Sequence, residues 1–493
     1  MQYNFKIKGG QLKMKTKISI LILAVNYLVF SQWGSDIRLT NNPSGSNTSF
    51  NNAWCIASSG SVVHAVWSDG RDGNAEIYHK RSVDGGISWG ADTRLTNNNA
   101  ISFQPSVAVS GSIVHLVWMD ERDGNLEIYY KRSSDGGVNW GTDTRLTNDP
   151  SGSRHPSLAV SGSVVHVVWM DSRDGNWEIY YKRSSDGGIS WGADTRLTNN
   201  TAFSWYPSVA VSGSVVHTVW EDSRDGNVEI YYKRSSDGGV SWGIDTRLTN
   251  NPNLSWRPSV AVSGLFVHVV WEEERDGNWE IYYKRSADGG ITWETDTRLT
   301  NNIALSRSSS VAALESFVHV VWQDERDGNW EIYYKRSTDA GVNWEIDTRL
   351  TNFIGFSEYP SVTTSGSTVH VVWEDTRDGN TEIYYKRNPT GNITSVINLT
   401  DFVAGEYKLF QNYPNPFNPS TTIEFEIPEM LNVRLVIYDI LGRQVAKLFD
   451  EETLPGRYKV EFNADNLNLS GGLYFYRLET QKFSDTKKLL LIK

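Results

Sequence analysis

Seven of the nine histidines recur at intervals of 51 residues, with no insertion between the first and the last. A period of this length means that each unit is one supersecondary module, which buries its apolar side chains only against neighbouring units. Residues that repeat seven times are first expected to hold the array together, so a unique site is expected where the copies differ. The histidines are His64, His115, His166, His217, His268, His319 and His370.

Each unit contains four short strand patterns. The second, V-V-H-V-V-W in the unit at 156–205, is apolar on both faces and is expected to be buried on both faces. An Asp-Gly hairpin signal follows it, and no segment has helical periodicity. Four strands repeated radially predict an all-β fold, a seven-bladed β-propeller. The strands expected in this unit are Pro156–Val160, Val164–Trp169, Glu178–Arg183 and Asp194–Thr198.

Composition excludes several classes of partner and scaffold. The net charge of −11 provides no basic surface, so nucleic acid and anionic membranes are poor partners. The single cysteine, Cys55, excludes a disulfide scaffold, and we expect it to be a small buried apolar side chain. No membrane span is expected in the mature chain.

The N-terminal segment has the pattern of an export signal. Lysines at 13, 15 and 17 precede an apolar run, Ile18–Phe30, which is too short for a comfortable membrane span. Small residues near position 31 suit cleavage, so residues 1–31 are predicted to be a signal peptide. Met14 is a candidate initiator, because residues 1–13 do not resemble the start of such a signal.

A turn of the form S-x-D-G-G-x-x-W recurs five times, and a sixth copy carries Ala340 in place of the first glycine. Its carboxylate can accept hydrogen bonds from turn amides, and its glycines permit a positive φ. The turn resembles the Asp-box, or BNR repeat, of sialidase-type propellers. The resemblance implies a structural turn between the third and fourth strands, on the face away from the ligand. The six carboxylates are Asp84, Asp135, Asp186, Asp237, Asp288 and Asp339.

The seventh unit lacks the box, and the start of the mature chain supplies its missing half. Residues 32–40 (Q-W-G-S-D-I-R-L-T) match the end of a box followed by a fourth strand. We therefore predict that Ile37–Thr40 pairs with Glu382–Arg387 and closes the ring, which removes exposed strand edges. An alternative is that Val396–Thr400 supplies this strand.

After residue 400 the repeat ends and a different β domain begins. Tyr413–Pro419 (Y-P-N-P-F-N-P) and Ile440–Arg443 (I-L-G-R) resemble the C-terminal type A sorting domain of the type IX secretion system. The resemblance implies an antiparallel β-sandwich that is handled by the secretion machinery of a Gram-negative bacterium. We therefore expect a secreted or cell-surface protein, with the propeller at 32–400 and the sorting domain at 401–493.

The repeated polar residues raise two possibilities for metal binding. Stacked sheets lie about 10 Å apart, whereas zinc needs each imidazole nitrogen at about 2 Å. Histidines of neighbouring units therefore cannot share an ion, and we expect their ring nitrogens to be hydrogen bonded between blades. The segment W-x-D-x-R-D-G-N-x-E, in which Glu273 replaces the first Asp once, has enough oxygens for calcium. We favour a hairpin whose arginine pairs with the carboxylates, and we expect no cofactor.

The loops that link successive units, and the hairpin position before Glu, vary most between the copies. Exposed Trp, Tyr and Arg side chains at such positions are typical of glycan-binding and protein-binding surfaces. Packing between the rims of the blades would explain them equally well. The first loop is also five residues longer than the others. The candidate ligand-binding residues are Phe103, Arg154, Trp177, Trp205, Tyr206, Trp256, Arg257, Trp279, Arg307, Trp330 and Tyr359.

Three functions are compatible with this pattern. Sialidases share the Asp-boxes, but the resemblance implies six blades and an asymmetric site with three arginines, a tyrosine paired with a glutamate, and an acid. In this chain the carboxylates and most arginines belong to the repeat, so we assign no catalytic residue. The preferred hypothesis is an exported, non-catalytic propeller that binds glycans or surface proteins. The alternatives are an exo-sialidase or other glycoside hydrolase, and a purely structural surface or matrix protein.

Overall fold

The computed structural model describes residues 33–49, 55–389, 391, 397–399, 406–429, 431–453, 455–464 and 469–492. The described residues form strands and turns and contain no α-helix, which confirms the all-β prediction. Accordingly, no helix in this part of the chain is long and apolar enough to cross a membrane. The predicted signal peptide lies outside the described residues.

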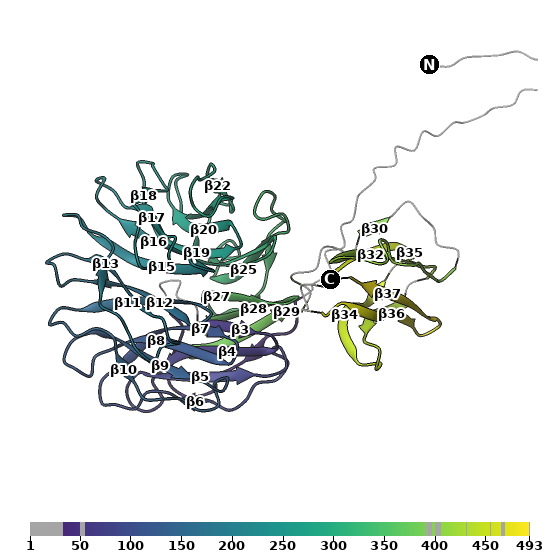
Figure 1. Ribbon diagram of the computed structural model, residues 1–493, viewed down its shortest axis with the longest axis horizontal. Coiled ribbons are helices and arrows are strands. Elements are labelled where there is room, and N and C mark those ends of the chain that lie inside the picture. The colour runs from purple at the N-terminus through teal and green to yellow at the C-terminus, as the bar shows by residue number, and fades with distance from the viewer. Residues whose placement is uncertain are drawn as a thin grey trace, which may run out of the picture. The chain divides into compact units, whose positions relative to one another are not determined.

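Each unit of the repeat forms one antiparallel sheet, or blade, and seven such sheets occur among the described residues. We number them 1 to 7 by their inner strands, which line a central channel. Figure 1 shows the blades following one another in chain order from purple to green. The inner strands are β3 (Ile56–Ser59), β7 (Ser102–Ser110), β11 (Ser153–Ser161), β15 (Ser204–Ser212), β19 (Ser255–Ser263), β23 (Ser306–Leu314) and β27 (Ser357–Ser365).

Outside each inner strand lie three further strands. The second strands are β4 (Val62–Asp69), β8 (Ile113–Asp120), β12 (Val164–Asp171), β16 (Val215–Asp222), β20 (Phe266–Glu273), β24 (Phe317–Asp324) and β28 (Thr368–Asp375). The third strands are β5 (Glu76–Ser82), β9 (Glu127–Ser133), β13 (Glu178–Ser184), β17 (Glu229–Ser235), β21 (Glu280–Ser286), β25 (Glu331–Ser337) and β29 (Glu382–Asn388). The outer strands are β6 (Thr93–Arg94), β10 (Thr144–Arg145), β14 (Thr195–Arg196), β18 (Thr246–Arg247), β22 (Thr297–Arg298), β26 (Thr348–Arg349) and β1 (Ile37–Arg38). In blade 1, β2 (Ser46–Asn47) also pairs with β4.

The chain start closes the ring as predicted. Strand β1 pairs with β29, with Ile37 opposite Tyr385 and Arg38 opposite Tyr384. Trp33 takes the place of the missing box tryptophan and packs edge-on against Tyr334 at 4.8 Å between ring centroids. The inner strand of blade 7 also contacts that of blade 1. Blade 7 therefore combines three strands from the end of the repeat with one from its beginning.

The alternative closing strand is wrong. The segment Ile397–Leu399 forms β30, which pairs with β35 (Gly456–Asn463) in the C-terminal domain. That domain therefore includes residues before 401, where we had placed its boundary. Strand β30 lies before the start of the C-terminal sequence pattern, and its partner β35 lies about 60 residues later. Local sequence pattern therefore could not assign the two strands to each other.

Close packing between blades explains the second glycine of the Asp-box. Tyr130 of blade 2 places its hydroxyl 2.8 Å from His115 Nδ1, and Trp191 of blade 3 packs against its ring edge-on. A Cβ atom on Gly188, in the same box as Trp191, would lie 1.8 Å from that hydroxyl. In blade 1, His79 replaces the tyrosine and its Nε2 lies 3.1 Å from His64 Nδ1.

For His64, His115 and His268 the prediction is correct for one ring nitrogen only. The Nδ1 atoms of six of the repeated histidines, from blade 2 to blade 7, lie within hydrogen-bond distance of tyrosine hydroxyls, for example 2.7 Å between His268 and Tyr283. Nε2 of His115 and of His268 has no hydrogen-bond partner among the described residues. Burial lowers the pKa of His115 to about 4, helped by the nearby Arg132 charge. The imidazole of His115 is therefore neutral at pH 7, and no positive charge on the ring has to be balanced by a second partner.

The Asp-box carboxylates form hydrogen bonds within their own turns. Asp186 accepts hydrogen bonds from Ser184 Oγ at 2.7 Å and from the Ser190 amide at 2.9 Å. Hydrogen bonds from Ser190 hold the pKa of Asp186 below its usual range. The Gly187 amide of the same turn donates to the Ser163 carbonyl at 2.8 Å, between the inner and second strands. The boxes and these turns therefore lie on one face, here called the box face.

The altered sixth box provides a stability prediction. Ala340 has a φ of 58°, a left-handed conformation that an alanine adopts at a cost of about 1 kcal/mol. We expect Ala340→Gly to raise the free energy of unfolding by about that amount, measured by urea denaturation. Ala287→Gly is the matched control, because Ala287 lies in the preceding box without a positive φ, and it should be neutral or destabilising. Equal effects of the two substitutions would contradict this explanation.

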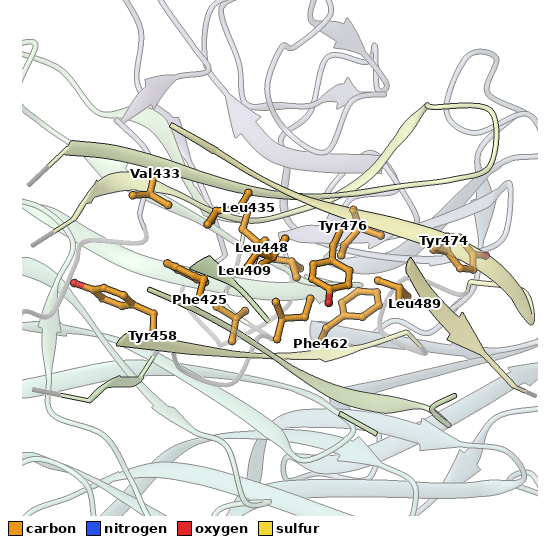
Figure 2. Close-up of a cluster of buried hydrophobic side chains, with 14 of the residues drawn as sticks. Leu409, Phe425, Val433, Leu435, Leu448, Tyr458, Phe462, Tyr474, Tyr476 and Leu489 are labelled. Carbon is orange, nitrogen blue, oxygen red and sulfur yellow. The ribbon is translucent and has the colours of Figure 1, made fainter. Parts of the chain in front are cut away.

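The C-terminal domain consists of two four-stranded antiparallel sheets, in the orders β30-β35-β32-β31 and β34-β33-β36-β37. Figure 2 shows its buried side chains, among them Phe425, Leu435 and Tyr476, gathered between the strands. Buried residues alternate with partly buried ones along the first six residues of β32, as a sheet with one apolar face requires. The remaining strands are β31 (Lys408–Leu409), β32 (Ser420–Ile427), β33 (Leu431–Tyr438), β34 (Gln444–Thr453), β36 (Gly472–Thr480) and β37 (Ser484–Leu491).

Candidate functional site

The Arg-Asp-Gly-Asn hairpins and the linking loops share one face of the propeller. In blade 2, Asn125 Nδ2 donates to the carbonyls of Asp149 and Ser151, each at 2.8 Å, in the loop that leads to blade 3. The corresponding asparagines of the other blades make the same pair of bonds. This surface, at the opposite ends of the strands from the boxes, is here called the hairpin face.

The repeated carboxylates of the hairpins are already engaged by protein donors. Asp120 accepts from Trp118 Nε1 at 2.8 Å and from Ser102 Oγ at 2.8 Å, and it forms a two-pronged pair with Arg122. Burial raises the pKa of Asp120, but hydrogen bonds from Arg122 and Trp118 outweigh burial and leave the pKa below its ordinary value. Arg122 Nη1 also donates a hydrogen bond to Asp143 Oδ2 at 2.6 Å. This is the arginine-paired hairpin that we favoured, while bound calcium stays a hypothesis.

Six inner strands begin with a bulge that places one residue in the left-handed region. The register with the second strand shifts at this point, for example between Trp205 and Ser208. A positive φ is costly for large side chains and is found mainly where the surrounding structure imposes it. These bulge residues lie at the hairpin-face end of the channel, here called the channel mouth. They are Gln104, His155, Tyr206, Arg257, Ser308 and Tyr359, with φ between 44° and 55°.

The side chain between Trp and Asp in a second strand accepts a hydrogen bond from the bulge amide of the next blade. Glu221 Oε1 accepts from the Arg257 amide at 2.7 Å. Gln323 Oε1 accepts in the same way from the Tyr359 amide at 3.0 Å. The bond satisfies an amide that the bulge removes from the sheet ladder. Met119, Glu221, Glu272 and Gln323 are seen in this role, whereas Glu374 accepts from the amide of Thr48 in blade 1, which is not a bulge residue; these five are here called acceptor residues.

Accepting this bond does not require a carboxyl group, because Gln323 and Met119 accept from the same kind of amide without an ionisable side chain. Glu221 and Glu374 are almost fully buried, and burial raises the pKa of each to about 8. Both are therefore mostly protonated at pH 7 and can then donate as well as accept a hydrogen bond. Buried carboxyls with strongly shifted pKa values are concentrated at functional sites.

Arg257 connects these groups across several blades. Its Nη1 donates to Ser308 Oγ at 2.9 Å. Burial raises the pKa of Tyr206, as does the charge of Glu221, whereas the charge of Arg257 lowers it. Arg257 also lowers the pKa of Tyr359, which burial and Glu358 raise. The channel mouth therefore gathers arginine, tyrosine and carboxyl groups that do not repeat from blade to blade.

In blade 7, two glutamates are paired on neighbouring strands of the sheet. Glu358 on β27 lies directly opposite Glu374 on β28. Burial raises the pKa of Glu358, and the charge of Glu358 adds to the burial that raises the pKa of Glu374. Two carboxyls in opposite positions destabilise a sheet whenever both are ionised, so sheet stability does not account for this pair.

The candidate residues from the sequence all lie on the hairpin face and keep part of their surface exposed. Trp256 stacks on Trp279 with 4.8 Å between ring centroids, and the Arg307 guanidinium lies 4.9 Å from the Trp279 centroid. Arg154 lies over Trp177 at 5.2 Å. Tyr206, Arg257 and Tyr359 are bulge residues at the channel mouth. Phe103, Trp205 and Trp330 are also half-buried on this face, and Trp205 contacts Phe203 at 5.2 Å.

Sequence reasoning missed the acceptor residues. Their signal was present, because the position between the invariant Trp and the acidic residue reads Ser, Met, Met, Glu, Glu, Gln and Glu from blade 1 to blade 7. That variation inside an otherwise constant buried strand marks a position with a non-repeating environment.

Comparisons with known proteins identify the tail and the fold. Residues 411–493 match the model of the secretion system C-terminal sorting domain. The chain is similar to the phage phi92 endosialidase, with 11% identity, a TM-score of 0.45 and coverage of 78% of this chain and 72% of that one. It is also similar to the polysaccharide lyase Uly1, with 8% identity, a TM-score of 0.51 and coverage of 72% and 99%. Trypanosoma rangeli sialidase follows with 11% identity, a TM-score of 0.43 and coverage of 81% and 85%. No curated protein matches the chain.

At such low identity the structural likenesses describe the fold and not the activity. The sorting domain, by contrast, carries a cellular address and implies contact with the type IX secretion machinery. The chain is therefore a secreted or cell-surface protein of a Gram-negative bacterium, built from a β-propeller and a C-terminal sorting domain.

Proposed function

We propose that this exported propeller is a non-catalytic module that binds glycans at the channel mouth of its hairpin face. The observation that carries the proposal is the set of non-repeating polar groups there, centred on Arg257, in an array that otherwise repeats seven times. Forked guanidinium donors, tyrosine hydroxyls and neutral carboxyls match the donors and acceptors of sugar hydroxyl groups. The half-exposed tryptophans nearby offer apolar faces for sugar rings.

A glycoside hydrolase is the second candidate, and Tyr206 favours it. This tyrosine feels the charges of Glu221, Arg257 and Arg154, and tyrosine nucleophiles are known in glycosidases. Screening the chain from residue 32 onward with fluorogenic glycosides, sialosides included, separates the two functions. Turnover that is lost in Tyr206→Phe would establish an enzyme and overturn the binding-module proposal.

Binding itself is tested with a glycan array. We expect the same protein to bind at least one class of glycan, and Arg257→Gln to weaken that binding by about tenfold or more, because hydrogen bonds to charged groups contribute about 1.5–3 kcal/mol. Affinities are measured by titration calorimetry with the best array ligand. Arg443→Gln is the control, since Arg443 is an exposed arginine of the sorting domain.

The alternatives predict different array results. A protein receptor or a purely structural role predicts no binding to any glycan, which would overturn the proposal. Equal affinities of Arg257→Gln and the unchanged protein would move the site away from the channel mouth.

A further inference from the structure

The blades meet on the hairpin face through one recurring backbone bond. The serine amide that begins each inner strand of blades 2 to 7 donates to the carbonyl of the hairpin residue before Glu in the preceding blade, as from Ser204 to Trp177 at 2.8 Å, and in blade 1 Ser46 of β2 makes this bond. The same bond joins Ser306 to Trp279 and Ser357 to Trp330, each at 2.8 Å. Each junction therefore places the hairpin residue of one blade beside the residues that flank the serine of the next.

Aromatic side chains occupy one continuous series of these junctions, and Phe103 adds a single one at the junction of blades 1 and 2. From the junction of blades 3 and 4 to that of blades 6 and 7, every junction has at least one. The junction of blades 7 and 1 instead combines Thr381 with Gly45 and Asn47. We call the aromatic series the aromatic arc; it consists of Trp177, Trp205, Trp256, Trp279, Trp330 and Phe356.

The arc side chains are held in place before any ligand arrives. Trp256 and Trp279 stack on each other, and Arg307 lies over Trp279 while it pairs with Glu272 at 3.0 Å. Trp177 and Trp205 both pack against the buried cluster between blades 3 and 4. Phe356 still exposes 50% of its surface. Rigid aromatic groups lose little conformational entropy when they bind a ligand.

We propose that the aromatic arc binds an extended glycan of several sugar residues, which lies across successive blade junctions. This rests on the proposed glycan-binding function and goes beyond it, because a single sugar at the channel mouth does not need the arc. The arc residues fall into groups: Trp256 and Trp279 stack on each other, whereas Trp177 and Trp205 belong to the cluster between blades 3 and 4. Exposed polar residues such as Asp174 lie at the hairpin tips of the same face. A protein interface favours one continuous apolar core, whereas separated platforms at a fixed repeat suit a polymer with its own fixed repeat.

Chain-length dependence of binding tests this inference. The chain from residue 32 onward is run in native gels containing xylan, mannan, β-glucan, alginate or hyaluronan, and oligomers of the retaining polymer are then titrated. We expect the dissociation constant to fall by about tenfold or more between two and six sugar residues, because linked contacts add avidity. Trp279→Ala should remove about tenfold of the affinity for the long oligomer and much less of that for the dimer.

The controls keep folding and position apart from ligand contact. Val228→Ala changes the same hairpin position at the junction of blades 4 and 5 and should leave affinity unchanged. Trp279→Phe retains a ring and should restore most of the binding if the ring face makes the contact. Equal affinities for dimer and hexamer would overturn the arc while leaving the channel-mouth site standing. No retention by any polymer, with array binding to short glycans intact, would do the same; failure of both assays would overturn both.

Discussion

A chain that begins at Asn42 is expected to lose about 6 kcal/mol of unfolding free energy and to associate through an open edge. The deletion removes Trp33, Ile37 and Leu39, and burying side chains of this size contributes about 2 kcal/mol each. It also leaves Arg377 without Asp36, to which its Nη1 donates at 2.7 Å. Thermal unfolding monitored by circular dichroism and size-exclusion chromatography measure the two effects.

A rearranged chain serves as the control for this deletion. In the shortened chain, residues 388 and 389 are replaced by a copy of residues 184–190 followed by a copy of residues 33–41. The first copy supplies the box turn, and Trp33 of the second copy supplies the box tryptophan. Blade 7 then has four strands in continuous order, as blades 2 to 6 have. We expect this chain to recover the lost stability and to be monomeric. A shortened chain that is monomeric and unfolds at the original temperature would show that β1 is dispensable.

Glu221→Gln is expected to stabilise the propeller strongly in alkaline solution and hardly at all in acid. Burial raises the pKa of Glu221 from 4.5 to about 8. Between these pH values the folded chain holds a proton that the unfolded chain has released, so the unfolding free energy falls as the pH rises. A shift of this size corresponds to roughly 5 kcal/mol. The variant lacks this loss, so its advantage should be absent near pH 4 and complete above pH 8.

The chain itself contains the matched arrangement for this experiment. Gln323 accepts a hydrogen bond from the Tyr359 amide just as Glu221 accepts one from the Arg257 amide, so the glutamine should keep the bond. The reverse substitution, Gln323→Glu, should make the protein less stable above pH 8 for the same reason. Urea denaturation at pH 5 and pH 9 gives the free energies. An advantage of Glu221→Gln that is the same at both pH values would show that the carboxyl is ionised in neither or in both.

The repeat made the propeller predictable because each blade is a local pattern. Four strands, a hairpin and a box lie within 51 consecutive residues, and each of the seven copies predicts the same structure. Ring closure was also readable, since residues 33–40 complete the box that is missing after residue 388. The expected outer strand Asp194–Thr198 is shorter in the structure, where β14 covers Thr195–Arg196.

Less of the candidate site could be predicted, because its interactions join different blades. The bond from the Arg257 amide to Glu221 spans 36 residues, and no local pattern announces that an arginine will adopt a φ of 51° at a bulge. The loops identified Tyr206, Arg257 and Tyr359 as candidates without showing that they meet at one channel mouth. Glu221 and Glu374 were hidden inside an apolar strand pattern, where a buried carboxyl is not expected.

Periodicity, motif spacing and the divided box therefore established the strands, the order of the blades and the presence of an export address. Tertiary structure decided three other features: the pairing of Ile397–Leu399 with the C-terminal sheet, the left-handed bulges, and the protonated glutamates. The physical reason is the range of the forces involved. Strand patterns follow from side chains a few residues apart, whereas desolvation and the satisfaction of a bulge amide depend on which blade packs against which.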